Sequence, residues 1–222
     1  GQAAANGIRA QYAAGETEGR ALAAYRATAE VAPHSMTETF VALRLLIDNP
    51  RWNGVPFHLA TGKALSERCT RITLRFKPAM ASLFDSAPCN ELVFQIQPNA
   101  GVSIRLAAKA PGPAFCLQPV HMDFRYADYF RSAPSTGYET LLYDCMTGDL
   151  TLFQRAEQTE AAWAAVQPFL DAWQDDLSPL QSYAAGSNGP DTRLWFEADA
   201  EPATAGVPAL LRETPAVERA PG

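Results

Sequence analysis

The sequence predicts an α+β fold, in which a large, mostly antiparallel β-sheet has helices packed on one face. Between residues 36 and 126, apolar and polar residues alternate in several short segments, which is the period of a β-strand. Between residues 138 and 174, the apolar residues recur every three and four positions, which is the period of a helix. The connections between the alternating segments are short, as antiparallel pairing allows.

The first two predicted strands precede the most informative turn of the chain. Residues 36–48 place apolar side chains on both sides of a strand, so we expect one face to be buried and the other to be partly covered. Asn49-Pro50 breaks this strand, because proline has no N–H to donate to a neighbouring strand. Residues 55–60 form the second strand.

Four further strands are predicted downstream. Residues 71–77 alternate most clearly, with Arg71 and its alternate neighbours facing outward and the intervening apolar residues facing inward. Residues 91–97 and 102–109 form a β-hairpin around the turn Pro98-Asn99-Ala100-Gly101. The last predicted strand spans 120–126. The intervening residues, 78–90 and 110–119, are interpreted as loops.

Two helices follow the strands. One is predicted from Tyr138, where apolar residues are spaced as on one helix face, to Gly148, which ends it. The other spans about residues 157–174, and Pro168 is expected to kink it or to remove one backbone hydrogen bond.

The ends of the chain show little periodicity. Residues 1–11 are Ala-rich and begin with the end of a helix, and residues 12–35 are interpreted as a surface connection. The chain after Leu177 is interpreted as irregular. We therefore expect one domain at residues 1–198 and a tail at residues 199–222, which are rich in Ala, Pro and Glu.

Composition argues against several function classes. The chain has 222 residues and a net charge of −6, without the Lys/Arg clusters of a nucleic-acid-binding protein. No apolar run is long enough to span a bilayer, and the N-terminus has no signal-peptide pattern, so we expect no membrane association and a cytoplasmic location. The four cysteines are far apart, which disfavours a zinc site and favours reduced thiols, and we expect no metal.

The segment from Trp52 to Arg68 carries the clearest chemical signal. An apolar run enters Thr61-Gly62, and Lys63 and Arg68 follow, five residues apart. Gly62 allows a sharp turn, Lys63 offers a mobile point charge and Arg68 a planar fork, a combination suited to an anionic or polyhydroxylated small molecule. The same spacing also fits a strand, a turn and two solvated cations, which is the commoner case.

Catalytic machinery is not evident in the sequence. It contains no Gly-rich phosphate loop, dinucleotide fingerprint or nucleophile elbow. Glu38, Glu67 and Asp123 are isolated carboxylates that we interpret as paired or solvated charges, and His58 as a structural histidine. Gln97 ends a strand and could bind ligand hydroxyls or only water.

Beyond these patterns, the chain resembles a known family, the C-terminal domain of glucose-6-phosphate dehydrogenase, from about Gln11 to Pro190. The resemblance rests on motifs in one order: Thr37-Glu38-Thr39-Phe40, Arg51-Trp52-x-Gly54-Val55-Pro56-Phe57, Thr61-Gly62-Lys63-Ala64-Leu65-x-Glu67-Arg68, Asn90-Glu91-Leu92-Val93, Gln97-Pro98-Asn99, Tyr138-Glu139-x-Leu141-Leu142-x-Asp144, Gly148-Asp149-x-Thr151-Leu152-Phe153-x-Arg155, Ala161-Ala162-Trp163 and Tyr183-x-x-Gly186-Ser187-x-Gly189-Pro190.

The resemblance implies a function. The family oxidises glucose 6-phosphate to 6-phosphogluconolactone in the pentose phosphate pathway and transfers hydride to NADP or NAD. Its C-terminal domain forms one wall of the sugar-phosphate site and the dimer interface, and its N-terminal domain binds the coenzyme. By resemblance, Lys63, Arg68 and Gln97 contact the sugar phosphate, and the chain forms a homodimer through its sheet face.

The resemblance also shows what these residues lack. The family's catalytic histidine lies in an Arg-Ile-Asp-His-Tyr-Leu-Gly-Lys-Glu segment, which this sequence does not contain, so it has no catalytic residue of its own and we expect it to be inactive alone. Gly1 in place of Met suggests a fragment or a tag remnant. Some members bind a second, structural NADP through several cations. By resemblance, neutral residues replace these cations here, at Ala60, Cys69, Thr73 and Gln95, and only Asp123 matches. We therefore predict that the structural NADP site is absent.

Two functions therefore compete. The first is a substrate-binding and dimerisation domain of an NADP-dependent glucose-6-phosphate dehydrogenase. The second is a non-catalytic interaction or regulatory module that derives from the same family.

Overall fold

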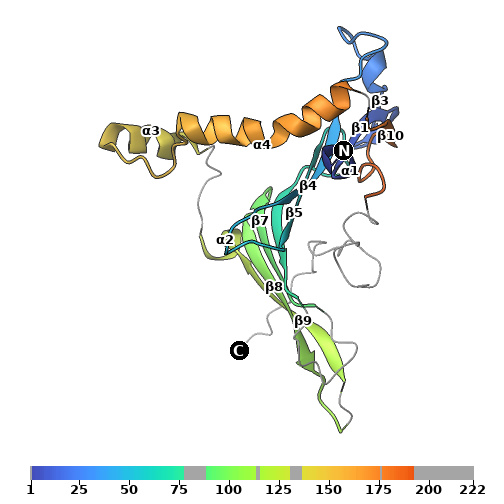
Figure 1. Cartoon of the computed structure of the whole chain (residues 1–222). Coiled ribbons are helices and arrows are strands. Elements are labelled where there is room, and N and C mark those ends of the chain that lie inside the picture. The colour runs from blue at the N-terminus through green and yellow to red at the C-terminus, as the bar shows by residue number, and fades with distance from the viewer. Residues whose placement is uncertain (1, 78–88, 114–115, 131–136, 176, 193–222) are drawn as a thin grey trace.

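A computed structural model describes residues 2–77, 89–113, 116–130, 137–175 and 177–192, and the α+β class is confirmed (Figure 1). Hydrogen bonding groups the strands into two four-stranded sheets, in the orders β10-β1-β4-β5 and β6-β7-β8-β9, and one two-stranded ribbon, β2-β3. The strands are β1 Gly7–Ala13, β2 Gly15–Thr17, β3 Arg20–Leu22, β4 Phe40–Leu46, β5 Pro56–Gly62, β6 Thr70–Arg75, β7 Glu91–Gln97, β8 Gly101–Lys109, β9 Leu117–Arg125 and β10 Leu180–Ala184. The helices are α1 Gln2–Ala5, the 3-10 helix η1 Tyr25–Ala27, α2 Tyr126–Tyr129, α3 Tyr138–Thr147 and α4 Ala156–Gln174.

All six predicted strands and both predicted helices are present, with shifted ends. The hairpin of β7 and β8 is confirmed, and α3 ends where Gly148 adopts the left-handed conformation, at a φ of 76°. The strand β4 is shorter than predicted at both ends, and β9 begins at Leu117, inside the segment predicted as a loop. Predictions for residues 78–88 and for the tail at 199–222 lie outside the described residues.

The prediction of a surface connection at residues 12–35 is wrong at its beginning. The strand β1 lies inside the first sheet, between β10 and β4, and it continues to Ala13. The ribbon β2-β3 and the helix η1 follow it. The sequence of β1 hides its burial, because its inward positions carry the small Ala10 and the polar Arg9 and Gln11. These polar side chains are buried by virtue of specific hydrogen bonds, which no periodicity reveals.

The interpretation of the chain after Leu177 as irregular is also wrong. Residues 180–184 form β10, which pairs in parallel with β1, and Tyr12 lies opposite Tyr183. Only Tyr183 of this strand is buried, so the segment lacks the apolar alternation by which a strand is recognised.

Both faces of the first sheet are packed. On one face, Leu43 contacts Phe169 and Trp173 of α4, and the other face carries a buried cluster of Ala10, Phe40, Ala42 and Tyr183. Leu65, in the connection after β5, packs against this second cluster. The segment that follows β5 therefore closes over the face opposite α4.

The second sheet has one apolar and one polar face. Cross-strand register places ten apolar residues on one face, called the apolar face below: Ile72, Leu74, Leu92, Phe94, Val102, Ile104, Leu106, Val120, Met122 and Phe124. On the opposite face, the buried Glu91 bridges Arg75 and Arg105, each at 3.0 Å. Ile72 and Met122 remain 56% and 53% exposed, so no described segment fully covers this apolar face.

Only the second half of α4 packs against the first sheet. Figure 1 shows α3 and the first half of α4 projecting away from the strands. Large apolar side chains of α3 stay exposed, including Tyr138, Leu142 and Met146. The helix α4 continues through Pro168, and its buried residues follow that proline.

Candidate functional site

The candidate site is built on the turn after β5. Phe40 of β4 lies opposite Gly62, the last residue of β5. A Cβ at Gly62 would lie 2.7 Å from Cδ2 of Phe40 and 3.2 Å from a methyl group of Leu65, so a side chain does not fit without displacing them. The expectation that Gly62 makes the turn through its backbone freedom is wrong, because Gly62 is the last residue of β5 and has no positive φ, whereas Ala64 adopts the left-handed conformation at a φ of 49°. A glycine is needed at position 62 because the chain lies directly on the Phe40 ring.

The backbone of this turn is held by two distant segments. The Lys63 N–H donates to the Thr39 carbonyl at 2.8 Å, and the Tyr183 hydroxyl donates to the Lys63 carbonyl at 2.7 Å. Further along, the Gly186 N–H donates to the Ala64 carbonyl at 2.8 Å, which fixes the turn against the end of β10. The turn is thus part of the folded core, although both of its cations point to solvent.

The side chains of Lys63 and Arg68 are exposed, and within the described ranges neither forms a hydrogen bond or ion pair. Gln97 lies nearby in the topology, because Thr70, two residues after Arg68, pairs with Gln97 across β6 and β7. The connection from β5 to β6 thus places three predicted ligand-binding residues at the same end of β6 and β7. Two cations and an amide with free donors can bind phosphate and hydroxyl oxygens.

A small hollow adjoins Lys63. Its volume is about 140 Å³, and its lining residues are Glu38, Thr39, Phe40, Val41, Thr61, Gly62 and Lys63. Glu38 brings a carboxylate to its edge, where the side chain is 22% exposed. The hollow therefore combines an anion-binding cation with hydrogen-bond acceptors.

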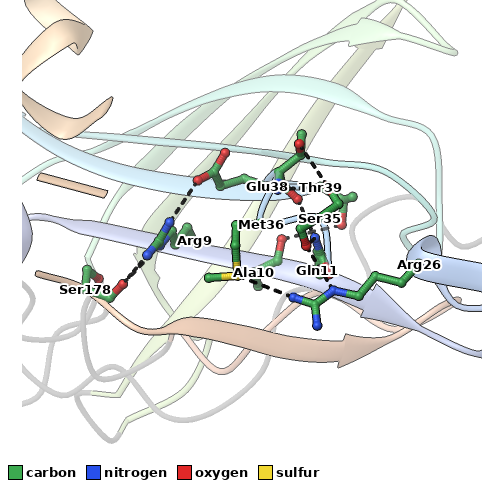
Figure 2. Close-up of polar contacts among 10 residues, drawn as sticks. Arg9, Ala10, Gln11, Arg26, Ser35, Met36, Glu38, Thr39 and Ser178 are labelled. Carbon is green, nitrogen blue, oxygen red and sulfur yellow. Dashed lines mark hydrogen bonds and ion pairs between the residues drawn. The ribbon is translucent and has the colours of Figure 1, made fainter. Parts of the chain in front are cut away.

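The segment that carries Glu38 and Thr39 is fixed from below by β1 (Figure 2). Arg9, whose side chain is 3% exposed, donates to the Ser178 carbonyl at 3.0 and 2.8 Å and pairs with Glu38 at 3.3 Å. The Gln11 amide donates to the carbonyls of Ser35 and Thr37 at 2.9 and 2.8 Å. These buried polar residues set the position of the hollow's edge.

The other predicted candidates stay outside this cluster. His58 lies on β5 opposite Arg44, and Asp123 accepts a hydrogen bond from Ser103 on the polar face of the second sheet. Glu67 is exposed in the turn.

Sequence reasoning identified Tyr183 only as part of a motif and missed its contacts. Its ring is 4% exposed, and its hydroxyl contacts both Thr39 and Lys63. Burial raises the pKa of the Tyr183 phenol, against the opposing effect of these hydrogen bonds. The signal in the sequence was an aromatic residue three positions before Gly186-Ser187, which by itself does not reveal a partner.

The structure also bears on a metal site and on a structural NADP site. Among the described residues, no three His, Cys, Asp or Glu side chains are grouped as a metal would require. Of the positions that the family resemblance relates to a structural NADP site, Asp123 is bonded to Ser103 and Gln95 to the Gln97 carbonyl, and neither is a cation. Among the residues that the structure describes, no helix is both long and apolar enough to cross a membrane.

Comparison with known proteins gives a consistent result. The family model "Glucose-6-phosphate dehydrogenase, C-terminal domain" matches residues 1–200. The glucose-6-phosphate 1-dehydrogenase of Aggregatibacter actinomycetemcomitans is 45% identical over 186 residues, which cover 83% of this chain and 37% of that protein. The enzyme of the same name from Chlamydia muridarum is 42% identical over 190 residues, covering 82% of this chain and 38% of that protein.

The fold comparison agrees. A structure of glucose-6-phosphate dehydrogenase in complex with its substrate glucose 6-phosphate superposes with a TM-score of 0.79 at 30% identity, covering 90% of this chain and 41% of that chain. The chain spans about two fifths of the length of the curated relatives that it matches.

Proposed function

Since this chain belongs to the family of glucose-6-phosphate dehydrogenase C-terminal domains, we propose that it supplies one wall of a glucose 6-phosphate site. The observation that carries the proposal is the turn after β5, where Lys63 is held by its backbone while its ammonium group is unpaired and exposed. A preformed backbone with free donors binds an anion without first breaking an internal ion pair.

Each residue has a separate role in this proposal. Lys63 and Arg68 bind the phosphate and orient the sugar, Lys63 as a point charge and Arg68 as a planar fork. Gln97, at the same end of β6 and β7, donates to or accepts from a sugar hydroxyl. These contacts are made equally to the ground state and the transition state, so they act mainly on substrate affinity.

The reaction proposed for the assembled enzyme is oxidation of glucose 6-phosphate to 6-phosphogluconolactone. NADP, bound mainly by a coenzyme domain outside this sequence, accepts the hydride. Because no catalytic histidine segment is present in the 222 residues, we propose that these residues position the sugar and are inactive alone.

We also propose that the chain forms a homodimer through the apolar face of the second sheet. Exposed contiguous apolar patches mark interaction surfaces, and Ile72, Val120 and Met122 are between 43% and 56% exposed on this face. Four free cysteines are consistent with a cytoplasmic location, where thiols stay reduced. The relatives are dehydrogenases, which favours this function over a non-catalytic interaction module.

The test of the substrate proposal is kinetic. In a hybrid enzyme, this chain replaces the matched region of the Aggregatibacter actinomycetemcomitans enzyme, and NADP reduction is followed at varied glucose 6-phosphate. Lys63→Ala and Arg68→Ala each raise KM for glucose 6-phosphate about ten- to a hundredfold, the value of a lost hydrogen bond to a charged group, with a smaller effect on kcat. Lys77→Ala, an exposed cation at the other end of β6, leaves KM unchanged.

Two results would contradict the proposal. One is an unchanged KM in both variants. The other is a soluble hybrid that binds NADP and does not reduce it with glucose 6-phosphate. The isolated chain gives an independent measurement, because glucose 6-phosphate should shift the amide NMR signals of Lys63 and Arg68 and leave that of Lys77 in place.

A further inference from the structure

Lys63 is held on both sides of its Cα by residues far from it in the sequence. Its N–H donates to the carbonyl of Thr39, which lies just before β4, and its carbonyl accepts from Tyr183 in β10. Both residues are buried, Thr39 at 8% and Tyr183 at 4% exposure. The backbone direction at Lys63 is therefore set by two core residues that do not reach solvent.

The hydroxyl groups of Thr39 and Tyr183 belong to one buried cluster of hydrogen bonds. The Tyr12 N–H donates to Oγ1 of Thr39 at 2.9 Å, and Oγ1 of Thr39 lies 3.1 Å from the Tyr183 hydroxyl. The Tyr183 hydroxyl has a single proton, and its shortest acceptor is the Lys63 carbonyl at 2.7 Å. The Tyr183 hydroxyl also lies 3.1 Å from the Thr39 carbonyl, and Oγ1 of Thr39 lies 3.4 Å from the Ala10 carbonyl, so the bond to the Lys63 carbonyl is the shortest in this cluster.

Packing leaves the Tyr183 ring little room to move. Its centroid lies 5.8 Å from that of Phe40 and 6.4 Å from that of Tyr12, both in edge-to-face geometry. Phe40 is itself enclosed by two glycines, because a Cβ at Gly62 or at Gly189 would lie 2.7 Å from its ring atoms. The hydroxyl thus reaches the Lys63 carbonyl from a ring that is fixed by its neighbours.

We infer that Tyr183 is a positioning residue for substrate binding, because its hydroxyl fixes the Lys63 backbone and thereby the origin of the Lys63 ammonium group. The inference rests on the proposed function, in which Lys63 binds the sugar phosphate. Tyr183 touches no substrate in this account, and it acts only through Lys63.

Burial also raises the pKa of the Tyr183 phenol above its ordinary value of 10.0. The phenol therefore keeps its proton throughout the neutral range and remains a donor to the Lys63 carbonyl.

The experiment compares Tyr183→Phe with Tyr25→Phe in the hybrid enzyme. Tyr25→Phe also deletes one phenol hydroxyl, from a ring that packs edge-on against Tyr12 but lies outside the bonded chain. Removing the Tyr183 hydroxyl leaves the buried Lys63 carbonyl without this donor, and we expect KM for glucose 6-phosphate to rise about three- to tenfold while kcat changes less than twofold. Tyr25→Phe leaves both parameters unchanged.

A double-mutant cycle with Lys63→Ala separates positioning from a general structural defect. When Lys63 has been replaced by Ala, Tyr183→Phe should raise KM no further, because the side chain that it positions is gone. If the two effects on KM instead multiply, Tyr183 acts independently of Lys63 and the inference is overturned.

The remaining outcomes distinguish the two levels of the account. If Lys63→Ala raises KM and Tyr183→Phe does not, the inference fails while the proposed function stands. An unchanged KM in Lys63→Ala overturns the proposed function and the inference with it. If Tyr183→Phe is insoluble, Thr39→Val breaks the same hydrogen-bonded chain one link earlier and must reproduce the rise in KM.

Discussion

The two four-stranded sheets of this chain differ in how complete they are. The first sheet is packed on both faces, by α4 on one side and by the turn after β5 on the other. The second sheet leaves its apolar face open, with Ile72 at 56% and Met122 at 53% exposure. The first sheet therefore carries the turn with Lys63 on a packed support, whereas the second sheet carries Gln97 and the apolar surface of the proposed dimer interface.

In the proposed function, this difference corresponds to a division of labour within the chain. Residues that bind a small anion need a fixed backbone, and the first sheet supplies it through Thr39 and Tyr183. An assembly surface needs exposed apolar area, which the second sheet supplies at the expense of its own burial. The predictions below test this division, beginning with the largest effect.

The sharpest contrast is between two phenylalanines. Phe40 is 4% exposed and packs against Gly62, Gly189 and Tyr183, whereas Phe76, just after β6, is 50% exposed. We expect Phe40→Ala to lower the free energy of unfolding by about 3–5 kcal/mol, as for other buried aromatic residues, and Phe76→Ala by less than about 1 kcal/mol. Urea unfolding of both variants at low protein concentration measures this, and equal losses would remove the contrast.

Two arginines give the second comparison. Arg9 is buried and is bonded to Ser178 and Glu38, whereas Arg71 is exposed on β6. Arg9→Ala leaves the Glu38 carboxylate without its buried cation and should cost about 3 kcal/mol of stability, against less than about 0.5 kcal/mol for Arg71→Ala. Thermal unfolding followed by circular dichroism would show this, and a Tm for Arg9→Ala equal to that of Arg71→Ala would contradict it.

The third comparison is between the two faces of the second sheet. Ile72 lies on the apolar face, and its neighbour Thr73 lies on the polar face. We expect Ile72→Asp to weaken the dimer by about 2 kcal/mol or more, because an unpaired charge enters an apolar interface, whereas Thr73→Asp leaves it intact. Size-exclusion chromatography with light scattering measures the molar mass of the wild type and of both variants. A monomeric wild-type chain would count against the interface.

The smallest expected effect is on alkaline stability. Burial raises the pKa of Tyr183 above its unfolded value of 10.0, so the folded state holds this proton more tightly. The resulting stabilisation is fully present below pH 10.0 and is lost as pH rises through the folded pKa. In unfolding measurements between pH 8 and 11, Tyr183→Phe should flatten this decline, and a decline equal to that of the wild type would exclude Tyr183 as its source.

Most of the fold could be predicted from the sequence where the apolar pattern is regular. The strands β6, β7 and β8 and both long helices follow clear periodicity. The turn after β5 was expected at the right place, but its left-handed residue is Ala64 and not Gly62. The strands β1 and β10 could not be predicted in this way. Their inward positions hold Arg9, Gln11 and Tyr183, whose burial depends on partners far away in the sequence.

The candidate site shows the same limit. Lys63, Arg68 and Gln97 were identified from local pattern and family resemblance, and register places Gln97 beside the connection that carries the two cations. The support from Thr39 and Tyr183 was not identified, because their hydrogen bonds span 24 and 120 residues from Lys63, respectively. Local sequence reveals which groups can bind a ligand, whereas tertiary structure reveals what holds them in place.

The most direct test of a preformed binding turn is amide hydrogen exchange in the chain without ligand. The N–H groups of Lys63, Ser66 and Gly186 each donate a 2.8 Å bond outside any strand pairing. If the turn is part of the folded core, these three amides should exchange as slowly as those of β1 and β4 and far more slowly than the amide of Glu67. Exchange at the rate of Glu67 would show that the turn opens freely, and the claim of a preformed wall would be wrong.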